Sequence, residues 1–114
     1  MSKFIPFLAA CMFCNLAWAQ SQSEMNETSW ADFQKADARL NVTYKKLLSK
    51  LDADGKKKLI AAERAWVAYR DAHADFEADL AARGGSMAPL IYNETCVELT
   101  EARIKELNKS ISEQ

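Results

Sequence analysis

AERAWVAYRDA, residues 62–72, combines large aromatic side chains and strong charges in one short segment. Trp66, Tyr69 and His73 follow one another at spacings of three and four, which places them on one face of an α-helix. Arg70 borders this face. A small domain seldom places a guanidinium beside its core unless a carboxylate meets it there. The segment therefore predicts a packed helix with an internal ion pair.

The same alternation extends over three long segments of the chain and predicts an all-α fold. Apolar residues recur at spacings of three and four within residues 29–51, 56–82 and 89–110. Gly55 separates the first two segments, and Gly84 and Gly85 separate the last two, as expected of connections between helices. None of these segments has the period of two that is typical of a strand. We expect an antiparallel three-helix bundle, with two long helices and a third packed against them.

The apolar residues at these spacings are the predicted core. Along the second helix they are Leu59, Ala62, Trp66, Tyr69, Phe76 and Leu80, with His73 as the polar member of the same stripe. The aromatic residues expected in the core of the whole bundle are Trp30, Tyr44, Trp66 and Tyr69. Thr28 or Ser29 is expected to cap the first helix, because a hydroxyl can accept a hydrogen bond from an otherwise unpaired N–H of the first turn. The same stripes could join two chains, which leaves a homodimer open.

Asp37 interrupts the apolar stripe of the first helix and is the predicted partner of the internal arginine. If the first hairpin turns near Gly55, Asp37 lies within one helical turn of Arg70. If the second connection centres near Gly85, Arg103 reaches the same level. We therefore expect Asp37 to pair with Arg70, Arg103 or both, as a structural charge cluster inside the bundle.

The N-terminus has the pattern of a secretory signal peptide. Lys3 is followed by an apolar run, and small residues at positions 17 and 19 mark a cleavage site before Gln20. The run is too short to span a bilayer, so we expect a periplasmic or secreted protein. Leu8-Ala9-Ala10-Cys11 also fits a lipoprotein cleavage box, and lipid attachment at Cys11 is the alternative. The predicted divisions are a signal peptide (1–19), a polar leader (20–28) and a single helical domain (29–114).

Charge and cysteine content exclude several kinds of partner and fold. The mature chain would hold 14 Lys and Arg (15 less Lys3) against 16 Asp and Glu, with the two signs interspersed along the sequence. This pattern lacks the clustered basic surface that binds nucleic acid. Cys11 and Cys14 leave with the signal peptide, so Cys96 remains without an internal disulfide partner. We expect a buried, inert thiol there, with a mixed disulfide or a disulfide dimer as the alternative.

Several short pieces, taken in order, resemble the lysozyme inhibitor LprI-like family of small exported bacterial helical proteins. The matching pieces are Met25-Asn26-Glu27, Ala36-Asp37 with Leu40-Asn41 and Tyr44, Glu63-Arg64-Ala65-Trp66 with Tyr69-Arg70-Asp71-Ala72, Gly84-Gly85-Ser86, and Cys96 with Leu99-Thr100 and Arg103. The resemblance implies a helical fold, an exported location and, for some members, inhibition of lysozyme. Thr28 and Ala74 stand where family members usually carry cysteines, so any disulfide that the family implies is lost here.

The sequence shows no pattern of a catalytic or metal site, and we expect neither an enzyme nor a cofactor. It has no Ser-His-Asp set, P-loop or glycine-rich nucleotide motif. Asp37 and Glu63 could serve as a carboxylate pair for hydrolysis, but pairing with arginine accounts for Asp37 without any chemistry. His73 and Glu77 are four residues apart on one helix, a spacing that suits a metal, yet the chain has one histidine and no second cluster of ligands.

Arg83-Gly84-Gly85-Ser86-Met87 is the predicted partner-binding loop. It offers a cation, bare backbone and a hydroxyl, and in a glycan-binding cleft it could place Arg83 beside catalytic carboxylates. A plain helix connection is the alternative. Lys56-Lys57-Lys58 would repel the many lysozymes that are basic. Two hypotheses follow: an exported protein that inhibits lysozyme by occluding its cleft, or an envelope module that binds another protein or itself through a helix face.

Overall fold

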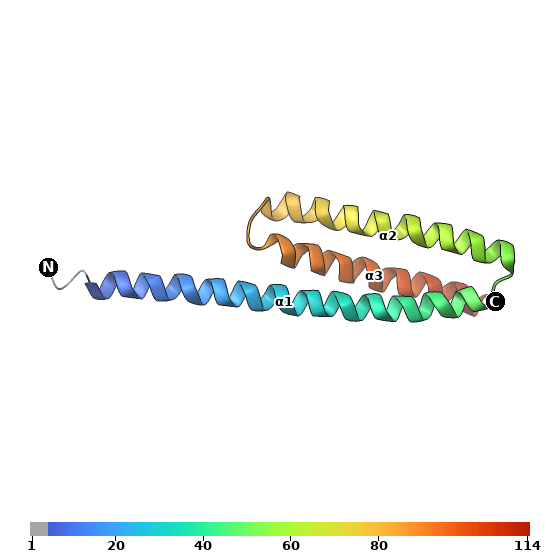
Figure 1. The fold of residues 1–114 in the computed structure, drawn as a ribbon, viewed down its shortest axis with the longest axis horizontal. Helices are drawn as coiled ribbons and strands as arrows, with labels where there is room; N and C mark the ends of the chain where they lie inside the picture. The colour runs from blue at the N-terminus through green and yellow to red at the C-terminus, as the bar shows by residue number, and fades with distance from the viewer. Residues whose placement is uncertain (1–4) are drawn as a thin grey trace.

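Three helices account for nearly all of the chain in a computed structural model, which describes the backbone of residues 5–114 (Figure 1). They are α1 (Ile5–Ser49), α2 (Ala53–Ala82) and α3 (Ala88–Ser112). Side chains are described for residues 17, 18 and 21–114. The predicted signal peptide of residues 1–19 and the lipid attachment at Cys11 therefore fall mostly outside the described side chains.

The chain runs along the bundle three times, so that α1 and α3 are parallel and α2 is antiparallel to both (Figure 1). Within the described residues the only regular structure is helical, which confirms the all-α bundle. The packing is uneven: α1 packs extensively on α3, α2 packs on α3, and α1 and α2 approach each other least. The two longest helices are thus held together mainly through the third.

Small side chains explain this arrangement. Ala36 of α1, Ala74 of α2, and Cys96 and Thr100 of α3 are all fully buried. Residues of this size allow the backbones of neighbouring helices to approach closely. Because α3 contributes two of them, it can lie close to both of the other helices. The wider space between α1 and α2 is filled by long side chains, described below.

The N-terminal end of the bundle differs from the sequence prediction. α1 continues without a break through residues 20–28, which the sequence predicts to be a polar leader, and Gln22 is buried there. Neither Thr28 nor Ser29 caps a helix, because both lie in the middle of α1, where the hydroxyl of Ser29 donates to the carbonyl of Asn26 at 3.0 Å. A helix of polar residues forms here because it packs against the rest of the bundle, and propensity alone does not reveal this.

The two connections have clear local causes. Asp52 is the N-cap of α2, and its carboxylate accepts a hydrogen bond from the N–H of Gly55 at 2.8 Å. Gly55 therefore belongs to the first turn of α2, whereas the sequence predicts it as a stop. In the second connection Gly84 has a φ of +65°, which favours glycine, and Pro89 lies in the first turn of α3.

The core divides into two parts along the bundle, and we name them by the connections at their ends. The turn half (38–69 and 101–114) contains a cluster of buried leucines, Leu40, Leu47 and Leu107, with larger apolar residues packed around it. The loop half (21–37 and 70–100) contains a smaller cluster of Phe33, Ala74 and Cys96, with Tyr92 and Val97 against it. The level of Arg70 separates the two halves.

The predicted core face of α2 is confirmed for Leu59 and Trp66, which pack against the leucine cluster, and is wrong beyond Trp66, where the helix turns another face inward. Its buried residues are Glu63, Arg70, Ala74 and Ala78, whereas the side chains of Tyr69, Phe76 and Leu80 are more than half exposed. Trp30 of α1 is 49% exposed. Of the four predicted core aromatics, Tyr44 and Trp66 pack against the leucine cluster, and Trp30 and Tyr69 do not belong to the core. Close packing on α3 favours alanine at the interface, and alanine gives a weak hydrophobic signal.

Candidate functional site

Arg70 occupies the centre of the bundle and connects all three helices. Its Nη1 donates to Asp37 Oδ1 at 3.0 Å and to the hydroxyl of Thr100 at 3.4 Å, and its Nε donates to Asp71 Oδ1 at 2.9 Å. The arginine side chain is 6% exposed, whereas the two carboxylates are nearly half exposed. A guanidinium that bonds to two carboxylates and a hydroxyl fixes the relative positions of α1, α2 and α3.

Aromatic rings complete the surroundings of Arg70. Its guanidinium carbon lies 4.8 Å from the ring centroid of Phe33 and 5.2 Å from that of Trp66, which is cation–π geometry. Burial alone would lower the pKa of Arg70, but the hydrogen bonds and negative charges of Asp71 and Asp37 outweigh burial and raise the pKa above its ordinary value. The arginine therefore stays charged and has a structural role.

Arg103, the other expected partner of Asp37, belongs to a separate cluster in the turn half. Its Nη2 donates to Glu63 Oε2 at 3.4 Å and its Nη1 to Glu106 Oε2 at 3.3 Å. Thr100, which precedes Arg103 by about one helical turn, takes the place opposite Arg70. Among the described residues, the buried atoms Glu63 Oε1 and Arg103 Nε have no hydrogen-bond partner. The charge cluster predicted as one unit is therefore divided between two levels of the bundle.

The loop of residues 83–87 lies exposed at one end of the bundle. Hydrogen bonds from Gly85 N to the carbonyl of Ala82 and from Ala88 N to the carbonyl of Gly85 make it a tight turn. The side chain of Arg83 is 85% exposed and forms a surface ion pair with Asp79 at 3.3 Å. Arg83, Gly84, Gly85 and Ser86 thus form one continuous exposed segment.

A polar network holds this loop against α1. Asn26 Nδ2 donates to the carbonyl of Ser86 at 3.3 Å, and Gln22 Nε2 donates to Asn26 Oδ1 at 3.0 Å. From α3, the amide of Asn93 donates to the hydroxyl of Ser29 at 3.1 Å. The sequence patterns considered above do not predict these residues as a group. Their signal was the spacing of Gln22, Asn26 and Ser29, which continues the core stripe of α1 with polar side chains.

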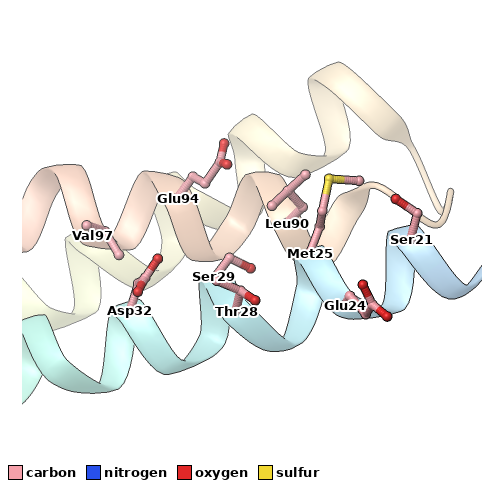
Figure 2. A pocket seen from close by; sticks show the side chains of 9 residues that line it. All are labelled: Ser21, Glu24, Met25, Thr28, Ser29, Asp32, Leu90, Glu94 and Val97. Atoms are coloured by element: carbon pink, nitrogen blue, oxygen red, sulfur yellow. The ribbon is translucent and has the colours of Figure 1, made fainter.

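A groove of about 440 Å³ lies between α1 and α3 beside the loop (Figure 2). Met25 reaches from α1 toward α3, where Leu90 and Val97 supply the rest of the apolar surface. The polar residues that line the groove are Ser21, Glu24, Thr28, Ser29, Asp32 and Glu94. The groove therefore combines an apolar surface with three carboxylates.

The fold separates charges that are interspersed along the sequence. In the loop half, ten acidic residues stand against three basic ones, which are Lys35, Arg70 and Arg83. In the turn half, eleven basic residues stand against six acidic ones. The lysines at 56–58 lie at the start of α2, at the opposite end from the 83–87 loop. The two ends of the bundle consequently carry opposite net charge.

The side chains of His73 and Cys96 fit structural roles. Among the described residues, no group of three or more His, Cys, Asp or Glu side chains is arranged to hold a metal; His73 lies 3.5 Å from Glu77 and stacks on the ring of Tyr69. Cys96 is fully buried, and burial raises the pKa of its thiol despite the nearby charge of Arg70. A buried thiol with a raised pKa is a poor nucleophile, because the thiolate is the reactive form.

These features define a small all-helical protein with an exposed loop, a charged groove and opposite charge at its two ends. The chain belongs to the family described as lysozyme inhibitor LprI, whose model matches residues 14–107. That description denotes inhibitors and not enzymes. The chain is also 35% identical over 104 residues to the uncharacterized protein R02472 of Rhizobium meliloti, covering 80% of this chain and 74% of that protein. No solved structure matches it.

Proposed function

We propose that this protein is exported and inhibits lysozyme by inserting the 83–87 loop into the substrate cleft. Membership in the lysozyme inhibitor LprI family supports an inhibitor of this kind. The observation that carries the proposal is the exposed loop fastened to the bundle through Asn26 and Ser86. A loop held in one conformation loses less conformational entropy when it binds than a free one does.

Arg83 is the side chain best suited to enter the cleft. Its ion pair with Asp79 is on the surface and stabilises the free protein by at most about 1 kcal/mol. Exchanging this pair for the catalytic carboxylates of a glycosidase would therefore cost little. Gly84 and Gly85 carry no side chains that would keep the backbone away from the cleft walls, and Ser86 adds a hydroxyl for sugar-like hydrogen bonds.

The distribution of charge supports the same orientation. A basic lysozyme is attracted to the acidic loop half, and the lysines at 56–58 that would repel it lie at the far end of the bundle. Opposite net charges at the approaching surfaces accelerate association and orient the partners before contact. The loop is thus carried on the end that a basic partner meets first.

Export rests on the N-terminal pattern and on the family. None of the described helices is both long enough and apolar enough to cross a membrane. We therefore favour release into the periplasm or outside the cell after cleavage near residue 19, with lipid attachment at Cys11 as the alternative. Mass spectrometry of the protein purified from its native envelope distinguishes these, because cleavage before Gln20 and acylation at Cys11 give different masses.

A lysis assay tests inhibition. Purified mature protein is titrated into a suspension of bacterial cell walls with a basic lysozyme, and we expect lysis to slow in proportion to the inhibitor added. Arg83→Ala should weaken inhibition about tenfold or more, since it removes a charge-assisted contact. Arg64→Ala removes an exposed arginine from the turn half and is the matched control. If wild-type protein fails to slow several lysozymes at large molar excess, the proposal is wrong.

The second candidate function is self-association or protein binding through a helix face. The exposed side chains of Tyr69, Phe76 and Leu80 on α2 favour it, because apolar groups at these spacings form a stripe. Sedimentation equilibrium over a wide concentration range tests this function. A dimer that Phe76→Ser disrupts would support it, and a monomer at all concentrations would remove self-association.

A further inference from the structure

We infer that the groove between α1 and α3 anchors a lysine or arginine side chain of a basic protein partner. This inference rests on the proposed function and extends it, because it gives the partner a second point of attachment beside the loop. The expected ligand of the groove is therefore a positively charged group at the end of an aliphatic side chain.

The chemistry of the groove matches such a side chain. Met25, Leu90 and Val97 form an apolar surface between the helices (Figure 2). Arginine and lysine bury their methylene groups on surfaces of this kind while the charged group stays near water. Glu24, Asp32 and Glu94 supply carboxylates around that surface.

These three carboxylates differ from three other acidic residues of the loop half, which are already paired with arginine. Asp37 and Asp71 are engaged by Arg70, and Asp79 is engaged by Arg83. In the described part of the chain, Glu24, Asp32 and Glu94 form no ion pair with any basic side chain. These three carboxylates are therefore available to a cation that a partner brings to the groove.

The position of the groove links it to the loop. Met25 in the groove is adjacent in sequence to Asn26, whose amide holds the carbonyl of Ser86. Leu90 lies in the first turn of α3, directly after the loop. A protein that receives the loop therefore also covers the groove. Because this end of the bundle is acidic, a basic surface fits it better than a neutral apolar one.

A pair of double variants tests the groove. Asp32→Asn with Glu94→Gln removes two groove charges, and Asp75→Asn with Glu98→Gln removes two exposed charges of the same half outside the groove. Both double variants change the net charge of the protein by the same amount, so the long-range attraction to a basic partner is the same for both. All four residues are exposed, and both variants should melt within a few degrees of wild type. The measurement is the association and dissociation rate for a basic lysozyme that the wild-type protein inhibits.

We expect the groove variant to dissociate about tenfold faster, whereas the control variant should change mainly the salt-dependent association rate. Equal dissociation rates for the two variants would overturn the groove assignment and leave the proposed inhibition intact.

If wild-type protein inhibits no lysozyme, the proposed function fails and the groove is tested by itself. The probe is a short amidated peptide, acetyl-Arg-Leu-Arg, followed by amide chemical shifts. Shifts centred on Met25, Leu90 and Val97 that the groove variant abolishes would support the assignment. Shifts elsewhere, or none at the highest soluble peptide concentration, would overturn it.

Discussion

The turn half and the loop half of the bundle are held together by different means. In the turn half, three buried leucines form an apolar cluster surrounded by larger side chains. In the loop half, much of the buried surface comes from small or polar residues: Gln22, Ser29, Ala36, Ala74, Ala78, Asn93 and Cys96. Small residues bury less apolar area, and the buried polar groups must find hydrogen bonds inside the protein.

This difference places stability at one end of the molecule and recognition at the other. The leucine cluster buries larger apolar side chains than the loop half does, and burial of apolar area stabilises the fold. The loop half has smaller buried side chains but presents a fastened loop and a groove lined by carboxylates. Arg70 lies at the boundary and couples the two halves. The following predictions test whether the division holds, beginning with the largest effect.

Truncation of the leucine cluster should have the largest effect on stability. Leu40 is 2% exposed, so Leu40→Ala should lower the free energy of unfolding by about 3–4 kcal/mol through lost burial and the cavity left behind. Met25→Ala truncates a partly exposed residue of the groove and should cost less than about 1 kcal/mol. Urea unfolding followed by circular dichroism measures both. Similar losses would mean that the two halves contribute equally.

Removal of Arg70 should cause the second-largest loss of stability. Arg70→Ala should cost about 3 kcal/mol, the lower end of the cost of breaking a buried ion pair, because Asp37 and Asp71 are half exposed and regain water. Arg39→Ala breaks an exposed pair with Glu101 and should cost about 0–1 kcal/mol. Thermal unfolding of the two variants compares them, and a loss for Arg70→Ala no greater than for Arg39→Ala would contradict its coupling role.

The polar network of the loop half should contribute less to the free energy of unfolding, and its effect should be confined to the region of the 83–87 loop. Asn93→Ala removes the hydrogen bond to Ser29 and should cost about 1–2 kcal/mol. It should also speed hydrogen exchange near residues 83–88, because Asn93 packs beside the segment that fastens the loop. Asn108→Ala, at an exposed position in the turn half, is the control. Unchanged exchange at the loop would show that the network does not hold it.

The smallest predicted effect is a dependence of stability on alkaline pH. Burial, the neighbouring Cys96 and the charge of Asp71 raise the pKa of Tyr92 to about 12, from an ordinary value near 10. Between these values the unfolded chain releases the phenolic proton while the folded protein keeps it, so stability falls as pH rises from about 10 to 12.

Denaturation at several pH values measures this effect. Tyr92→Phe should flatten the loss of stability across the same window, and Tyr69→Phe, at an exposed position, should not. Parallel curves for wild type and Tyr92→Phe would mean that Tyr92 makes no contribution to the loss.

The fold class and the level of the central arginine follow from the sequence, but the rotation of α2 does not. Glycine positions and helical periodicity are enough to predict three helices and the antiparallel order. The same hairpin register brings Asp37 opposite Arg70. On α2, however, the aromatic stripe is the stronger hydrophobic signal, and the stripe of Arg70, Ala74 and Ala78 that packs inside is weaker. Only the close approach of α3 shows which stripe is buried.

The features of the loop half are harder to predict for physical reasons. A displacement of one helical turn decides whether Thr100 or Arg103 lies opposite Arg70, and the length of the second connection does not fix this displacement. Gln22, Asn26 and Asn93 carry no hydrophobic signal, although their spacing matches the core. The separation of charge between the two halves cannot be predicted from the order of residues, because each half is assembled from segments that are distant in sequence.

The opposite charges at the two ends of this rod also give it a permanent electric dipole along its length. Near an anionic surface, such as a layer of acidic lipid headgroups, this dipole experiences a torque. The lysine-rich end turns toward the surface and the glycine loop turns away from it. A loosely adsorbed molecule would then stand upright and display its loop to whatever diffuses past.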